Sequence, residues 1–437
     1  MTEKDLLIKN DIREQSEGSS ESLNSMKGED YIPLNKSDAK KNASLFSSVA
    51  NLSNAVLGSG ILSLPYVFSL MGWALGMIML FAVAGISWVT LQMFAITIRK
   101  VGKYTYEEIA EAAYGKKFSI FMKICIFGIT LSASTSYLVI VGDTFPKVFN
   151  YSNPDGHSFW TGRVWISICL MLVVCFPLSM MKKMDSLKFT STLSFISISY
   201  LVCLIIVRFP SLNATLKASE TVAFRWNYMK ILTGVPNIIF ADTAHVVLLN
   251  VMGEFSNPTD KRIKKLTSLT LLACNVLYTI ASLFGFFSFG TNASGNVLNG
   301  YKDNDIGAVI GRLVIGIVGI VSFPLFVHVA RSSINHLLFH NKPFSWFRHM
   351  AVTLIFCGFT QTMALVLPEI QLITAFSGST FSLISVFISP VLCYMKLIIP
   401  DSSRKQRIKY YLLMAFGVLL MCVCLSMIIM NQILHEK

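Results

Sequence analysis

Apolar residues dominate the chain from about residue 45 onward and fall into long blocks separated by short polar segments. A membrane-spanning helix needs about 20 mostly apolar residues, because no water is available there to satisfy an open backbone. The pattern therefore predicts an all-α integral membrane protein with about eleven transmembrane helices. Their approximate ranges are 45–70, 73–98, 118–142, 162–180, 189–209, 230–252, 266–290, 306–335, 348–367, 369–398 and 410–432.

The first 44 residues are mostly polar, and no cleavable signal peptide is visible among them. Such a composition is typical of disordered chain, which has too little apolar surface to bury. We expect a disordered cytoplasmic tail over 1–44 and a transmembrane domain over 45–437. Within this domain, spans 1–5 occupy about 45–209, spans 6–10 about 230–398 and span 11 about 410–432.

The composition argues against a soluble enzyme. Apolar residues make up 53% of the chain and charged residues 14%, whereas soluble domains carry about 25% charged residues. We find no Gly-x-Ser-x-Gly, no His-Glu-x-x-His and no phosphate-binding Gly-Lys-Ser/Thr loop. The nine cysteines fall in apolar stretches without metal-ligand spacing, which predicts buried structural thiols. We therefore expect no catalytic residue and no cofactor apart from a coupling ion.

The net charge is +13. The basic residues are concentrated in every second loop, for example at 261–265 and 404–409. Short cytoplasmic loops carry such an excess of Lys and Arg, so the N-terminus is predicted to be cytoplasmic and the C-terminus external or lumenal. Two glycosylation-type triplets, at Asn213 and Asn292, fall in the predicted outer loops. The basic loops lie beside anionic lipid, and no nucleic-acid partner is needed to explain them.

One inner loop carries a helix signal of its own. Thr105 precedes Glu108 with capping-box spacing, and Ile109, Ala112 and Ala113 share one face of the segment 104–114. We expect a short helix along the membrane, with a solvated connector as the alternative.

The first span contains an interruption signal at Gly58, Ser59 and Gly60, followed by Pro65. Backbone freed in mid-membrane must line a protein cavity or a water-filled site. Freed amides at the start of the second half-helix would then face a carboxylate, and freed carbonyls would suit a small cation. Tight helix packing through small residues is the alternative explanation.

The sixth span carries a second interruption signal. Pro236 is followed by Asp242 and His245 within an otherwise apolar run. Interrupted helices at corresponding positions of two halves indicate a transporter site at an inverted repeat, and ionisable residues at this depth are usually functional. The alternatives are a neutral His245 bonded to a backbone carbonyl and an Asp242 carboxyl bonded to the freed amides.

The eighth span places Ser322 beside Pro324, where a hydroxyl would suit a cation site. A hydrogen bond from Ser322 to the preceding turn is the alternative. Arg312 and Arg331 lie near opposite ends of this span, so we expect them to act as anchors that reach toward the interface. We expect His328 to be structural.

At these residues the sequence resembles the amino acid/auxin permease family, and most of all its sodium-coupled neutral amino acid transporter branch. The matching segments, in family order, are NLSNAVLGSGIL at 51–62, KFTSTLS at 188–194, Val235-Pro236 with His245, LFGFFSF at 283–289, and Pro324 through Arg331 to Ser333. The resemblance implies a leucine-transporter-type 5+5 inverted repeat with helices one and six broken. It also implies a substrate site at Asn54, Gly58, Ser59, Gly60, Phe240, Ala241, Asp242, Thr243 and His245, and a Na⁺ site at Asn54, Leu57 and Ser322.

The chain departs from the family pattern around the sixth span. Ala244 stands where the family often has Cys, residues 250–253 replace a Pro-x-Ile-Tyr motif, and Asp242 stands where an apolar residue is usual. A buried acid could carry a proton, so the coupling ion can be Na⁺ or H⁺.

We therefore hypothesise secondary active transport of neutral amino acids by alternating access, in the plasma membrane or a vacuolar or lysosomal membrane. The partners implied are the amino acid substrate and membrane lipid. The alternatives are an amino-acid sensor that signals through the tail at 1–44 to a cytosolic partner, and a channel.

Overall fold

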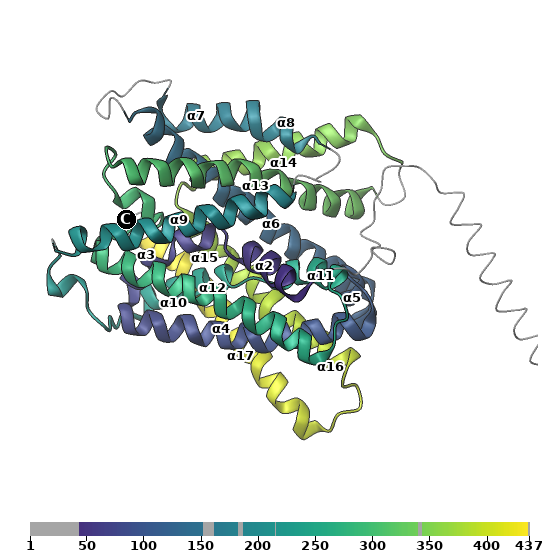
Figure 1. Ribbon diagram of the computed structural model, residues 1–437. Coiled ribbons are helices and arrows are strands. Elements are labelled where there is room, and N and C mark those ends of the chain that lie inside the picture. The colour runs from purple at the N-terminus through teal and green to yellow at the C-terminus, as the bar shows by residue number, and fades with distance from the viewer. Residues whose placement is uncertain (1–42, 152–160, 182–186, 215, 340–342, 436–437) are drawn as a thin grey trace, which may run out of the picture.

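The computed structural model describes residues 43–151, 161–181, 187–214, 216–339 and 343–435 (Figure 1). The predicted tail lies outside the described residues except for its last two positions. The regular secondary structure of the described residues is helical, apart from one isolated bridge between Ala43 and Phe255. This agrees with the all-α class that the sequence predicts.

The predicted helices are present with small shifts at their ends. The main elements are α2 (Leu45–Val56), α3 (Leu64–Met71), α4 (Trp73–Val101), α5 (Tyr106–Tyr114), α6 (Lys116–Phe149), α7 (Arg163–Leu170), α8 (Phe176–Ser179), α9 (Leu187–Asn213), α10 (Tyr228–Ala241), α11 (His245–Glu254), α12 (Asp260–Phe289), α13 (Ile306–Leu338), α14 (Trp346–Val366), α15 (Ile370–Ser377), α16 (Ser389–Leu397) and α17 (Arg404–His435).

Nine of the described helical segments are long and apolar enough to cross a membrane. The two other predicted spans are also helical but differ in form. Residues 163–179 form a shorter apolar helix with a π-helical middle, and residues 45–71 are interrupted at Leu57 and Gly58. The chain is therefore built as an integral membrane protein.

Helix α6 forms the centre of the bundle and α17 its edge. In the most apolar stretch of α6, 78% of the residues are buried, against 17% in α17, so α17 presents apolar side chains outward. Figure 1 shows α7, α8 and α14 on one side of α13, and α4, α10 and α12 on the other. The C end and helix α5 lie at opposite ends of the bundle in this view.

The short helix expected at 104–114 is present as α5. The Thr105 hydroxyl accepts a hydrogen bond from the Glu108 N–H at 3.3 Å, which caps the helix start as predicted. Ile109 and Ala113 are buried against the bundle, but the predicted Ala112 is exposed and Ala110 takes its place. The buried face of α5 therefore contains Ala110 in place of the predicted Ala112.

The prediction that Arg312 and Arg331 are anchors at the interface is wrong, because both side chains are buried. Arg331 donates to the Ser179 carbonyl at 2.7 Å and to the Thr353 hydroxyl at 2.9 Å. These contacts join α13 to the end of α8 and to α14. A guanidinium with five donors can satisfy itself inside a protein when carbonyls and hydroxyls surround it.

The expectation of buried thiols holds for six cysteines and is wrong for three. Cys169, Cys203 and Cys422 are exposed on the outward faces of apolar helices. A small apolar side chain is acceptable on such a face, because lipid rather than water lies outside it.

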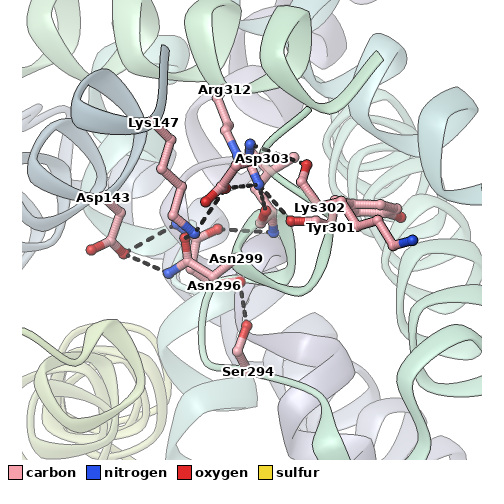
Figure 2. A network of polar contacts seen from close by, with 10 residues as sticks. Asp143, Lys147, Ser294, Asn296, Asn299, Tyr301, Lys302, Asp303 and Arg312 are labelled. Carbon is pink, nitrogen blue, oxygen red and sulfur yellow. Dashed lines mark hydrogen bonds and ion pairs between the residues drawn. The ribbon is translucent and has the colours of Figure 1, made fainter. Parts of the chain in front are cut away.

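The loop between α12 and α13 is fastened to α6 by polar contacts of Asp143 and Lys147 (Figure 2). The Asp143 carboxylate pairs with Arg163 at 3.0 Å and accepts hydrogen bonds from the side-chain amides of Asn296 and Asn299, each at 3.2 Å. Lys147 donates to the side-chain oxygen Oδ1 of Asn299 at 3.0 Å. One helix end thus holds the loop at two successive turns.

The same loop wraps around the buried Arg312 of α13 (Figure 2). The guanidinium donates to the carbonyls of Tyr301 at 2.7 Å and Leu298 at 3.1 Å, and it pairs with the Asp303 carboxylate at 3.1 Å. The loop therefore closes one end of the bundle around a positively charged side chain that is fully buried.

The start of α13 is fixed by a further ion pair, 2.7 Å long, between Asp305 and Arg208 of α9. Partial burial raises the pKa of the Asp305 carboxyl, but the hydrogen bond from Arg208 and those from the Ala308 and Gly307 backbone outweigh it. The pKa of Asp305 is therefore held below its usual value.

We expect Arg312→Met to loosen this end of the bundle, because three carbonyls and one carboxylate lose their donor. The free energy of unfolding should fall by about 1–3 kcal/mol, the usual cost of buried polar groups left unpaired. Thermal unfolding in detergent measures the change. Lys302→Ala is the matched control, because the Lys302 side chain is exposed. Equal melting temperatures for both variants would contradict the role of Arg312.

Candidate functional site

The interruption predicted in the first span lies at Leu57 and Gly58. Helix α2 ends at Val56, Gly58 takes φ −111° and ψ −146°, and a 3₁₀ turn over Ser59–Leu62 leads into α3. The Val56 carbonyl accepts from the Gly58 N–H at 2.8 Å instead of from a helical partner. The two Gly residues and Pro65 thus have the local effect that the sequence indicates.

The sixth span is interrupted over 242–244. Helix α10 ends at Ala241, Asp242 follows with φ −86° and ψ 13°, and α11 begins at His245. Pro236 lies inside α10 and does not break it. The discontinuity therefore falls at the polar residues rather than at the proline.

The two interruptions meet at Tyr278 of α12. Its hydroxyl lies 2.9 Å from the Val56 carbonyl oxygen and 3.0 Å from that of Ala241, and the side chain is fully buried. The single hydroxyl proton is thus shared between the last carbonyl of α2 and the last carbonyl of α10. Sequence reasoning missed Tyr278, because a single Tyr in an apolar span carries no signal beyond packing.

The broken segments also touch directly. A Cβ placed on Gly60 would lie 2.8 Å from the Ala241 Cβ and 3.0 Å from its Cα, so only a glycine permits this approach. The 3₁₀ turn therefore packs against the end of α10 through bare backbone. This contact brings the predicted substrate residues Gly60 and Ala241 together.

The first N–H groups of the 3₁₀ turn and of α11 have no carbonyl one turn before them in their own helix. At Ser59 the backbone meets the hydroxyl of Tyr137 from α6, and a Cβ on Gly58 would lie 3.2 Å from the same oxygen. Each half-helix start carries a partial positive charge, which favours a carboxylate nearby.

Asp242 and His245 are both fully buried. Asp242 Oδ1 accepts from the Asn275 side-chain amide at 3.4 Å, and His245 Nε2 lies 3.1 Å from the Thr90 hydroxyl oxygen. Neither contact is the one the sequence suggested, because side chains replace the expected backbone groups. Asp242 Oδ2 and His245 Nδ1 have no hydrogen-bond partner among the described residues.

The remaining predicted substrate residues surround this break. Phe240 and Thr243 are half-buried, and the Thr243 hydroxyl donates back to the Ile239 carbonyl at 3.0 Å. The Phe240 carbonyl accepts from the Thr243 N–H at 3.2 Å. The side chain of Thr243 is thus engaged within its own helix.

The predicted cation ligands lie around the first break. Leu57 and Ser322 are buried, and Asn54 is half-buried with an Oδ1 that has no hydrogen-bond partner among the described residues. Ser322 hydrogen-bonds to the Tyr137 hydroxyl, so it meets the break through Tyr137. Tyr137 was missed by sequence reasoning for the same reason as Tyr278.

A sequence model described as "Transmembrane amino acid transporter protein" matches residues 41–430, which is most of the chain. The chain belongs to this amino acid transporter family. The resemblance found at the interrupted helices is thereby confirmed, and the protein is a transporter-family member rather than an enzyme.

Two relatives of this amino acid transporter family member align over nearly its whole length. "Vacuolar amino acid transporter 5" of Schizosaccharomyces pombe (strain 972 / ATCC 24843) is 28% identical over 416 residues, which cover 91% of this chain and 97% of the relative. "Sodium-coupled neutral amino acid symporter 2" of Danio rerio is 26% identical over 419 residues, which cover 90% and 83%.

We expect Gly60→Ala in this transporter-family member to force the two breaks apart, because the new methyl group meets the Cβ and the backbone of Ala241. Overpacking of this kind costs about 1–3 kcal/mol. Amino acid uptake and the melting temperature in detergent should both fall. Gly85→Ala in α4 is the control, since a Cβ there meets nothing within 4 Å. A Gly60→Ala protein that equals the control in both assays would show that the contact is not needed.

Proposed function

We propose that this protein moves neutral amino acids across its membrane by alternating access, coupled to Na⁺ or H⁺. The observation that carries the proposal is the meeting of two interrupted helices at Tyr278 in the buried centre of the bundle. Helices interrupted at such a depth are found where a transporter binds its substrate.

The substrate carboxylate would bind the N–H groups around Gly58, Ser59 and Gly60, where it would have to replace the Val56 carbonyl at Gly58 and the Tyr137 hydroxyl at Ser59. Its ammonium would bind the carbonyl end of α10, at Phe240 and Ala241. These opposite helix ends carry partial charges of opposite sign, which match the two charges of an amino acid. Thr243 and His245 would lie along the substrate side chain.

A coupling Na⁺ would bind near Asn54, Leu57 and Ser322. Asn54 Oδ1 is buried without a partner among the described residues, which supports a ligand at that atom. Tyr137 lies between Ser322 and the first break, so a cation there would need the phenol to move or to join the site. Na⁺ binding would then tie α13 to the break in the first span.

We also propose the full arrangement of eleven spans with a 5+5 inverted repeat. Two features support it: each proposed half opens with an interrupted span, at 45–71 and at 228–254, and two further helical segments accompany the nine long ones. The cytoplasmic N-terminus and a cytosolic partner of residues 1–44 stay predictions.

In this scheme the α12–α13 loop would close one side of the site. Its contacts to Asp143, Lys147 and Arg312 would have to break when the site opens to that side. Surface-exposed ion pairs contribute little, so the buried contacts of Arg312 would supply most of the resistance to opening.

Counter-flow in proteoliposomes tests the function. Vesicles preloaded with one amino acid at a time should take up the labelled form of those that the protein carries, in Na⁺ buffer or in choline buffer. Empty vesicles are the blank. The absence of exchange for every neutral amino acid, with protein shown to be folded, would overturn the proposal.

If Na⁺ couples, Ser322→Ala should raise the Na⁺ concentration for half-maximal uptake by about tenfold, which corresponds to about 1.4 kcal/mol. The reason is the loss of one ligand oxygen. Ser426→Ala is the matched control, because Ser426 is exposed on α17 and donates only to the Val423 carbonyl. The same Na⁺ requirement in both variants would remove Ser322 from the site.

A further inference from the structure

Asp242 is a buried acid with half of its carboxyl unpaired. The side chain is fully buried, Oδ1 accepts one hydrogen bond from Asn275, and Oδ2 has no partner among the described residues. A buried polar atom without a partner costs free energy unless something unseen satisfies it. The position therefore indicates a ligand at Oδ2.

The surroundings favour a positive ligand. Asp242 is the C-terminal cap of α10, and the C-terminal end of a helix carries partial negative charge, which opposes a carboxylate. The titratable groups that face it are Cys274 and Tyr278 of α12, and no Lys or Arg in the described part of the chain pairs with it. An unpaired carboxylate at this depth is expensive, so the charge must be neutralised.

A proton fits this position better than a metal cation. A hard cation collects several oxygen ligands, whereas the Asn275 amide is the one hydrogen-bond partner that the Asp242 carboxyl has among the described residues. A proton needs only the carboxyl oxygen itself. The unpaired Oδ1 of Asn275 gives a protonated carboxyl one neutral acceptor nearby.

Helix α12 connects this acid to both interruptions. Asn275 and Tyr278 are three residues apart, so they lie on one face of the helix. The Asn275 amide is shared between Asp242 Oδ1 at 3.4 Å and the Leu271 carbonyl at 3.0 Å. An ionised Asp242 carboxylate attracts the Asn275 amide more strongly than a protonated carboxyl does. Ionisation therefore pulls the face of α12 that carries the Tyr278 hydroxyl toward Asp242.

We propose that Asp242 binds the proton that drives transport, and that Asn275 and Tyr278 transmit its protonation state to both broken helices. The inference rests on the proposed transport function and names its coupling ion. Oδ2 takes one proton from water on the side where the site is open and returns it to water on the other side. No covalent bond to the substrate forms. Asn275 and Tyr278 are positioning residues.

The test uses the full chain in proteoliposomes with choline as the only external cation besides H⁺. Acidifying the donor side should raise wild-type uptake by about tenfold per pH unit while Asp242 is mostly ionised, because one proton must bind first. A trapped pH-sensitive dye should report proton entry together with the amino acid. Asp242→Asn should abolish the response of uptake to pH, and Asp242→Glu should restore it.

Two further variants separate a coupling role from a packing role. Tyr278→Phe removes only the hydroxyl and should flatten the pH profile, and Asn275→Ala should do the same. Asp401→Asn alters an exposed acid and should keep the wild-type profile. A structural defect alone would lower uptake at every pH without changing the ratio between acidic and neutral buffer.

Other outcomes overturn the inference in distinguishable ways. If Na⁺ drives wild-type exchange and pH does not change it, the proton site is excluded, but the transport function stands. A pH response that persists in Asp242→Asn would move the proton elsewhere. If Asp242→Asn does not fold, wild-type uptake without dye-reported proton entry would still refute the proposal. No counter-flow of any amino acid in the wild type would refute both proposals.

Discussion

A carbonyl that loses its helical partner inside a membrane must find another donor, and the structure meets this requirement at one point. The Tyr278 hydroxyl lies within hydrogen-bond distance of the last carbonyls of α2 and α10 and shares its one proton between them, so a single side chain holds two broken helices at a common place. Unsatisfied backbone in lipid costs several kcal/mol per group. The arrangement of the site therefore depends on α12 keeping its register with both breaks.

The close approach of bare backbone at Gly60 and Ala241 complements this polar contact. Packing brings the two segments together, and the hydrogen bonds of Tyr278 fix their orientation. Around them the side chains of Asp242, His245 and Asn275 each have one polar atom without a hydrogen-bond partner among the described residues. A fully satisfied polar network makes a rigid core, whereas partly satisfied groups leave capacity for a ligand. The centre of the bundle thus combines a fixed backbone with polar side-chain atoms that can still accept or donate a hydrogen bond to a ligand.

Much of this architecture could be predicted from the sequence. The spans follow from the length of the apolar blocks, and Gly58 and Gly60 indicate the first break because few other residues so weaken a helix. The second break was expected in the correct span, but Pro236 proved to be tolerated inside α10. Arg312 was wrongly placed at the interface, because its partners are carbonyls of a loop whose path cannot be predicted from the local sequence. Tyr137, Tyr278 and Asn275 escaped notice because their roles arise from contacts more than 30 residues apart.

The central claim is that an amino acid binds between two interrupted helices. Electron cryomicroscopy of the protein in lipid nanodiscs, with a transported amino acid present, tests it most directly. The account predicts substrate density between the Gly58–Gly60 turn and the end of α10, with Tyr278 beside both helix ends. Continuous helices across residues 45–71 and 228–254, or substrate density elsewhere, would contradict it.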